Sequence, residues 1–353
     1  MGIVFAILLF SFLIFIHELG HFIAAKLSGV QVNEFSMFMG PALFKKQIGE
    51  TLYSIRCIPI GGYCAMEGED TDSDNPRAFG RASWWKRLII LISGSGMNLI
   101  SGILIMFIVL LPVKQITEPV ISSFTPYSTV NGENGLQVGD RLLEIDGEKI
   151  YEYSDFNMIL YFNPGDVHDV VVLRDGQEVV LNDFKMEKHA VIDEAGNESM
   201  KFGISFAKTE MDMGLRLKYT WNSSINVIRN VRLSLQMLVT GRAGLSDISG
   251  PVGIVQMMSD TAESSETTLD AVMNVLYFGG FIAINLAVMN MLPIPALDGG
   301  RVVCLLLTTA YEKITRKKIN PKYEGYLHGA GMILLLLLMA VIMFKDIFVI
   351  FKG

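Results

Sequence analysis

The 353-residue chain is too apolar for an ordinary soluble protein. Hydrophobic residues make up 51% of it and charged residues 18%, whereas about a quarter of the residues of a globular domain are charged. This composition excludes a wholly soluble protein and predicts a polytopic α-helical membrane protein embedded in the lipid bilayer. No basic patch with interleaved aromatic residues indicates binding to nucleic acid.

Four apolar stretches, residues 2–16, 88–113, 271–297 and 325–344, contain no Asp, Glu, Lys or Arg, and the first becomes long enough to span a membrane when residues 17–26 are added. A helix needs about 20 apolar residues to cross a bilayer, and we predict four membrane-spanning helices over residues 2–27, 86–113, 271–297 and 325–350. The first segment has no Lys or Arg before Lys26 and no small-residue cleavage site. We therefore interpret it as a retained helix rather than a cleaved signal peptide.

The net charge of −7 is unevenly distributed along the chain. Residues 113–210 contain 18 acidic and 8 basic residues, whereas the loop after the first helix and the loop near residues 313–322 are basic. The positive-inside rule places both basic loops in the cytoplasm. We therefore predict a multi-pass protein of the inner (cytoplasmic) membrane, with both termini and the acidic region on the extracytoplasmic side.

Residues between the predicted spans have the patterns of short strands and turns. Residues 51–66 indicate short β segments around Pro59 and the pair Gly61-Gly62. Residues 138–150 and 169–181 each alternate apolar and polar side chains around an Asp-Gly turn, with a predicted helix at 153–161 between them. They predict a small water-exposed α/β or barrel-like module.

A second, amphipathic region follows that module. In residues 215–240 apolar side chains recur at spacings of three and four, which predicts an amphipathic helix. Its apolar stripe could lie on the membrane or pack on the module, and the sequence leaves both open. Residues 249–255 break this helix, and a polar linker is predicted to lead to the third span.

Residues 17–21 read His-Glu-Leu-Gly-His at the end of the first apolar segment. On a helix, positions i and i+4 share one face, so His17 and His21 can both reach one Zn²⁺ at about 2.0–2.1 Å. Glu18 lies beside them, where it could take a proton from a water molecule. A membrane-edge helix that ends in snorkelling polar residues is the alternative, but it does not account for three such residues at ligand spacing.

A third zinc ligand is expected because catalytic zinc sites usually have three protein ligands. Asp298 is the candidate, since it ends a 27-residue uncharged stretch and is flanked by two prolines and two glycines. Irregular backbone at membrane depth occurs only where it is buried in protein or lines a cavity. His17 and Asp298 also reach similar depths along their helices, in the cytoplasmic part of the bilayer. An Asp that caps a helix at the membrane edge is the alternative.

These motifs together resemble the site-2 protease family of intramembrane zinc metalloproteases. The resemblance rests on the His-Glu-x-x-His pattern, on Asp298 in its Leu-Asp-Gly-Gly setting, and on the Asn- and Pro-containing run 285–295. Residues 58–63, 93–98 and 249–254 extend it to the bacterial regulator-of-sigma-E protease branch. The likeness covers almost the whole chain. Residues 115–208 resemble a PDZ domain, and the chain has room for one such domain.

The resemblance implies roles for residues of the site. His17, His21 and Asp298 would bind zinc, and Glu18 would be the general base. It further implies an intramembrane zinc metalloendopeptidase that cuts transmembrane segments of single-span proteins in regulated intramembrane proteolysis. Anti-sigma factors and remnant signal peptides are the substrates usual for the family. The sequence identifies neither the substrate nor a ligand of the PDZ-like domain.

Substrate-binding residues are also implied by the resemblance. Asn290, and with it Asn285, would hold the substrate backbone or its oxyanion. Asn98 would help to place the substrate, with a buried packing amide as the alternative. Gly61 and Gly62 would belong to a membrane-dipping β-loop that pairs with an unwound substrate as an added strand, with a simple cytoplasmic hairpin as the alternative.

The chain is therefore divided into four predicted parts. These are an N-terminal membrane part (1–114), a PDZ-like domain (115–208), an amphipathic helix with a linker (209–268) and a C-terminal membrane part (269–353). A metal-free PDZ-bearing membrane scaffold is the alternative function, but a scaffold needs none of the four site residues. A metal-ion transporter, the other alternative, has no use for Glu18 or for the PDZ-like domain.

Overall fold

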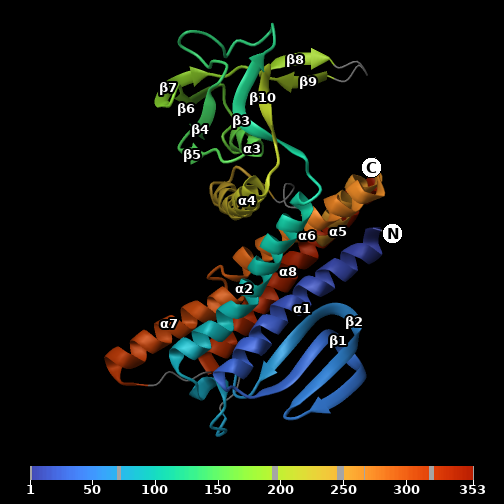
Figure 1. Cartoon of the computed structure of the whole chain (residues 1–353). Coiled ribbons are helices and arrows are strands. Elements are labelled where there is room, and N and C mark those ends of the chain that lie inside the picture. Colours follow the sequence, from blue (N-terminus) through green and yellow to red (C-terminus); the bar gives the residue numbers. More distant parts are fainter. Residues whose placement is uncertain are drawn as a thin grey trace. The chain divides into compact units, whose positions relative to one another are not determined.

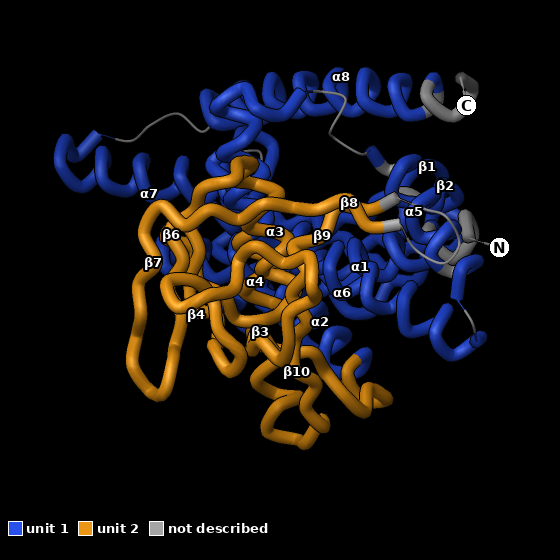
Figure 2. Tube along the Cα trace, turned by 90° about the horizontal axis from the view of Figure 1, so that it is seen from above, with its two compact units in different colours: residues 1–109, 230–353 blue, residues 110–229 orange. Residues whose placement is uncertain are grey.

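The computed structural model describes residues 2–69, 73–192, 198–244, 250–265, 267–317 and 322–352 (Figure 1). Parts of three predicted segments, residues 193–197, 245–249 and 318–321, therefore lie outside the described residues. The chain forms two compact units, which are coloured separately in Figure 2. The membrane unit comprises Met1–Val109 and Asn230–Gly353, and the β-rich unit comprises Leu110–Arg229. The β-rich unit extends beyond the predicted module at both ends.

Four helices in the described part of the membrane unit are long and apolar enough to cross a membrane. They are α1 (Gly2–Ser28), α2 (Trp84–Leu110), α6 (Thr268–Asn290) and α8 (Lys322–Lys352). At 1.5 Å per residue each is long enough for a hydrocarbon core of about 30 Å. The beginning of α1 and the end of α8 lie at the same end of the bundle, as an even number of crossings requires (Figure 1).

Glycines at the helix crossings bring α1, α2 and α6 close together. A Cβ atom on Gly20 of α1 would collide with the backbone of Ser93 in α2. On the other side of α2, a Cβ atom on Gly102 would lie 2.5 Å from Ile284 of α6. Small residues of this kind let backbones approach within a membrane, where the hydrophobic effect does not drive helices together.

A long hairpin connects α1 to α2. It consists of β1 (Val32–Ile48) and β2 (Thr51–Met66), paired antiparallel with several register shifts, and the short 3₁₀ helix η1 (Phe79–Arg81) precedes α2. The predicted short β segments in 51–66 are confirmed, because residues 52–55 and 62–65 of β2 each pair with residues 34–37 of β1. The strand β1 was not predicted. Val32, Phe35 and Cys64 of the hairpin pack in one apolar cluster with residues of α1 and α2.

The third span is shorter than predicted. Instead of continuing to residue 297, α6 ends at Asn290, and a turn over 291–297 leads into an unpredicted helix, α7 (Asp298–Thr315). The prolines in the turn lack a backbone donor and disfavour helical geometry in the residue before them. Asp298 is therefore the first residue of a helix and not a cap at the end of one.

The predicted polar linker before the third span is also wrong. In its place the structure has α5 (Pro251–Glu263), which begins with a proline at its first position, where no intrahelical donor is needed. Ile254, Val255 and Met258 of α5 pack in one cluster with residues of α1 and α6. Packing against two helices thus stabilises this short segment, whose first half is apolar and whose second half is polar.

Asp346 of α8 completes the beginning of α5. Its buried carboxylate accepts a hydrogen bond from the backbone N–H of Gly253 at 3.1 Å, and Gly250, the residue before α5, provides no side-chain cap. We expect Asp346→Leu to destabilise the chain by about 1–2 kcal/mol, as loss of a helix cap does, and Asp346→Asn to cost less because its amide oxygen can still accept. Thermal unfolding in detergent measures both. Equal stability of the Leu variant and the wild type would contradict the capping role.

The β-rich unit is built on a sheet with the strand order β10-β3-β4-β6-β7, with β5 pairing to β4. Two Asp-Gly pairs, Asp146-Gly147 and Asp175-Gly176, have positive φ at both positions, as tight hairpin turns require. Both predicted strand–turn–strand units and the intervening helix are confirmed. The elements are β3 (Gln115–Phe124), β4 (Arg141–Ile145), β5 (Glu148–Lys149), α3 (Tyr153–Phe162), β6 (Val167–Arg174), β7 (Gln177–Lys185), β8 (His189–Ile192), β9 (Glu198–Lys201) and β10 (Ile204–Glu210).

The predicted amphipathic helix is α4 (Met213–Val239). Of the two placements left open, the first part of α4 packs on the β-rich unit. The hydroxyl of Ser223 donates to Glu152 at 2.8 Å, and Arg229 forms a buried ion pair with Asp155 at 2.6 Å. Burial, together with the nearby charge of Asp155, raises the pKa of Glu152 to about 7, whereas the Ser223 hydroxyl and Arg229 act in the opposite direction.

This carboxyl group should make the stability of the β-rich unit depend on pH. The folded pKa of Glu152 lies above the unfolded value of about 4.3, so its stabilising contribution is complete below that pH and is lost as the pH rises through about 7. We expect Glu152→Gln, which stays neutral, to be more stable than the wild type at pH 8 by up to about 3 kcal/mol and to lose this advantage at pH 4. Urea unfolding at pH 8 and pH 4 measures the stability of both proteins. An equal gain in stability at the two pH values would contradict the raised pKa of Glu152.

Candidate metal centre

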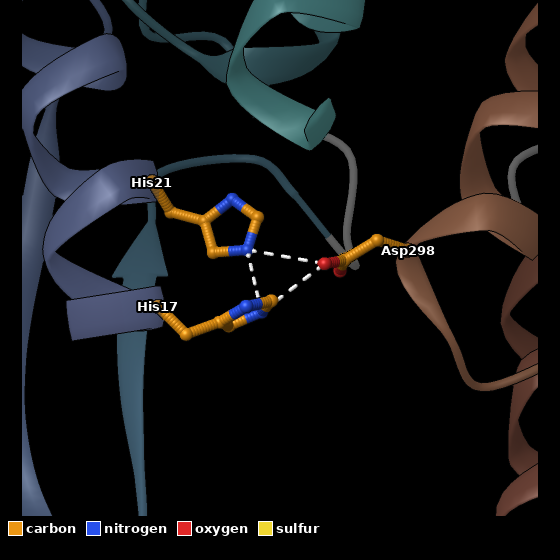
Figure 3. Close-up of side chains that lie close together, drawn as sticks. All are labelled: His17, His21 and Asp298. Atoms are coloured by element: carbon orange, nitrogen blue, oxygen red, sulfur yellow. Dashed lines mark hydrogen bonds and ion pairs between the residues drawn. The ribbon is translucent and has the colours of Figure 1, made fainter. Parts of the chain in front are cut away.

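Two segments far apart in the sequence bring three donor atoms together. His17 and His21 lie on α1, and Asp298 lies at the start of α7 (Figure 3). Oδ2 of Asp298 is 3.1 Å from Nε2 of His17 and 3.4 Å from Nε2 of His21, and the two nitrogens are 3.2 Å apart. Atoms that bind one zinc ion tetrahedrally at about 2.0–2.1 Å lie about 3.3 Å from one another. The three separations therefore fit one zinc ion.

The donor set and its surroundings also suit zinc. Two imidazoles and one carboxylate are a common ligand set of catalytic zinc, and three protein ligands leave a fourth position open. Oδ2 of Asp298 is buried and has no hydrogen-bond partner in the described part of the chain, and it lies next to the two ring nitrogens. Because Asp298 is the first residue of α7, the helix dipole favours its ionised form.

A backbone carbonyl of α2 orients one of the imidazoles. Nδ1 of His21 lies 2.8 Å from the carbonyl oxygen of Ile90. Since a carbonyl can only accept, the ring must carry its hydrogen on Nδ1. The lone pair of Nε2 then points toward Asp298, which is the orientation a metal ligand needs.

Asn98 lies behind the other imidazole. Its side chain is 1% exposed, and its amide nitrogen is 3.4 Å from Nδ1 of His17. The amide oxygen of Asn98 is buried and has no donor in the described part of the chain. With the amide rotated, this oxygen could accept the hydrogen that Nδ1 carries when Nε2 binds a metal. Asn98 is thus packed against a metal-site residue.

Gly94 is a site residue that the sequence reasoning missed. A Cβ atom at this position would collide with Nε2 of His21 and lie 2.8 Å from Cε1 of His17. Gly96, two residues further along α2, has open space around it. The Gly-Ser-Gly run in 93–98 was noted only as part of a resemblance, because sequence spacing does not reveal which glycine faces another helix.

Strand β2 lies beside Glu18, the polar residue between the two histidines of the motif. The backbone of Cys64 lies beside Glu18. A Cβ atom on Gly62 would lie 3.5 Å from Cγ of Glu18 and 3.1 Å from the carbonyl oxygen of Ser36. Gly61 has a φ of +78°, a backbone conformation that residues with a side chain rarely adopt. The predicted glycine pair is therefore next to the predicted general base.

Two predicted substrate-binding residues are placed on α6. Asn290 is the last residue of that helix and Asn285 lies within it, and both side chains are partly exposed. Among the described residues, the hydrogen bonds and ion pairs of His17, His21 and Asp298 do not include either of them. The structure thus does not join them directly to the three donor residues.

Membrane-spanning helices around a histidine–carboxylate centre, with a carboxylic acid beside it, define a membrane-embedded metallopeptidase. The comparisons with known proteins agree. A family model described as peptidase family M50 matches residues 5–338. A protein of Clostridium perfringens named as a zinc metalloprotease is 37% identical over 349 residues, 98% of each chain. The regulator of sigma-W protease RasP of Bacillus subtilis is 28% identical over 423 residues, 97% of each chain.

The chain therefore belongs to peptidase family M50. It is an intramembrane zinc protease involved in regulated proteolysis, as the sequence predicted, and the metal-free scaffold is not favoured. A further relative, from Fusobacterium nucleatum, is also named as a zinc metalloprotease and is 32% identical over 354 residues, 98% of each chain. The sequence similarity to these relatives extends over nearly their whole length and therefore includes both units of the chain.

Proposed function

We propose that the chain hydrolyses peptide bonds within transmembrane segments of single-span membrane proteins, with His17, His21 and Asp298 as zinc ligands and Glu18 as general base. The observation that carries this proposal is the convergence of the three donor atoms at 3.1–3.4 Å. When bound, Zn²⁺ supplies Lewis acidity that makes water a nucleophile near neutral pH. Glu18 lies on the same helix, beside His17, where it accepts the proton of that water and delivers it to the leaving amine.

The β-hairpin is proposed to receive the substrate. A transmembrane helix hides its carbonyl groups in its own hydrogen bonds, so a segment must unwind before it can be cut. The position of β2 beside Glu18, with Gly61 and Gly62 leaving the backbone accessible, supports pairing of the unwound segment as an added strand. Asn290 and Asn285 are proposed to bind the substrate backbone or its oxyanion.

The β-rich unit is proposed to be a PDZ-like domain on the extracytoplasmic side of the inner membrane. Its acidic composition and the positive-inside rule support that side, and they support a metal centre near the cytoplasmic side. Such a domain would bind a peptide and admit substrates whose ectodomains have been trimmed. Membrane-bound anti-sigma factors and remnant signal peptides are the proposed substrates, and the name of the sigma-W protease relative supports the first class.

Removal of the metal tests the proposal. We expect the full chain in liposomes to cleave a single-span test substrate, to lose this activity after dialysis against a chelator, and to regain it with zinc at one ion per chain. A scaffold would leave the substrate intact at every zinc concentration. A transporter would move zinc into the liposomes without cutting the peptide, and either result would refute the proposed function.

A further inference from the structure

A second cluster of ligand-type side chains lies on α7 and α8. Possible ligand atoms of Cys304, Glu324 and His328 lie within 4.8 Å of one another. His328, however, forms a hydrogen bond that makes it unsuitable as a metal ligand. Its Nδ1 accepts a hydrogen bond from the backbone N–H of Ala296 at 3.0 Å. A backbone N–H can only donate, so the ring carries its hydrogen on Nε2, 3.9 Å from Glu324, and neither nitrogen offers a lone pair to a metal.

The partner of that hydrogen bond has an unusual backbone conformation. Ala296 has a φ of +80°, in the left-handed region that residues with a side chain rarely adopt. Such a conformation persists only when the surrounding structure holds it. Ala296 lies two residues before Asp298, in the turn 291–297 that joins α6 to α7. Its conformation therefore sets the direction in which the chain enters α7.

A second contact fixes the same turn to α8. Gly331 lies one turn along α8 from His328, and a Cβ atom on it would come within 2.5 Å of Cβ of Pro295 and 2.7 Å of its carbonyl oxygen. By contrast, Gly329 has open space around it. Two residues of α8, His328 and Gly331, thus hold two successive residues of the turn, one by a hydrogen bond and the other by close packing.

We propose that His328 is a positioning residue that holds the turn through Ala296 and so places the carboxylate of Asp298 against His17 and His21. The proposal rests on the assignment of Asp298 as a zinc ligand. The two histidine ligands share one helix and keep their spacing without help, whereas Asp298 depends on the turn before it. Residues that orient ligands in this way typically contribute about 10–100-fold to metal affinity or activity.

Three substitutions of His328 separate this role from simple packing. The amide oxygen of Asn can replace Nδ1 as the acceptor for Ala296, whereas the amide of Gln reaches the Nε2 position and Phe supplies no acceptor. We expect His328→Phe and His328→Gln to bind zinc about 10–100-fold more weakly in competition with a chelator, with a parallel loss of cleavage, and His328→Asn to remain close to the wild type. Zinc affinity is measured on the purified full-length chain and does not depend on turnover.

A matched pair of glycines keeps the test decisive if the Phe variant does not fold. Gly331→Ala should weaken zinc binding because its methyl group pushes on Pro295, whereas Gly329→Ala should not. Normal zinc affinity in His328→Phe, or an Asn variant as weak as the Phe variant, would overturn the proposal, as would a second zinc ion in the wild type that Cys304→Ser removes. A wild-type chain that binds no zinc would refute the proposed function instead.

Discussion

Glu18→Gln is expected to reduce peptide cleavage by about 10²–10⁴-fold, the usual contribution of a general base, while zinc remains bound. The amide has nearly the same shape as the carboxylate but does not accept the proton of the attacking water. Zinc should stay because Glu18 is not one of the three converging donors. Cleavage of a single-span substrate in liposomes and the metal content of the same preparation measure both effects.

Glu50→Gln is the matched control for that experiment. Glu50 is another carboxylate of the membrane unit, and it pairs with Lys26 and Arg77 rather than with a site residue. We expect this variant to cleave at the wild-type rate. If Glu18→Gln retained zinc and also cleaved at the wild-type rate, the assignment of Glu18 as the base would be refuted.

Gly94→Ala is expected to have an effect of similar size although it removes no functional group. The added methyl group would occupy the space of the His21 ring and press on His17, so the two nitrogens could no longer face Asp298 together. A displacement of about 1 Å in an active site can cost about 10²-fold in rate. We therefore expect a loss of at least about this size in cleavage, together with weaker zinc binding, as measured by chelator competition.

The same substitution at Gly96 provides the control. Alanine favours helices over glycine by about 1 kcal/mol, so neither substitution should weaken α2 through its helix propensity. Gly96 has open space around it, and Gly96→Ala should therefore retain zinc and activity. Full zinc affinity in the Gly94→Ala variant would show that the ligands do not need this close approach.

The parts of the site that could be predicted are those that depend on short stretches of sequence. His17 and His21 have the spacing of one helix face, and Asp298 stands out as a carboxylate at the end of an apolar run. The roles of Ile90 and Gly94 depend on how α2 packs against α1, and no spacing within α2 encodes that contact. Sequence patterns therefore identified the candidate ligands but missed the residues that orient them and the space that they need.

In the fold, too, elements that depend on local sequence were predicted, whereas elements that depend on long-range packing were missed. The four spans and the two hairpins with Asp-Gly turns follow from hydropathy and turn chemistry. In contrast, α5 was missed because its apolar residues pack on α1 and α6, a contact that its own short sequence does not encode. The helix α7 was missed because the uncharged run continues through the turn at 291–297. The strand β1 was not predicted, because it is stabilised by pairing with two stretches of β2, 52–55 and 62–65, and no local pattern encodes that pairing.

The position of Asp298 has a consequence for how the protein is made. The two histidines are translated near the beginning of the chain, whereas the carboxylate comes after more than four-fifths of it, and α8, which holds the turn before Asp298, comes last. A chain still emerging from the ribosome thus carries only part of the ligand set. We therefore expect a nascent chain to have no protease activity until α7 and α8 have been made and have entered the bilayer.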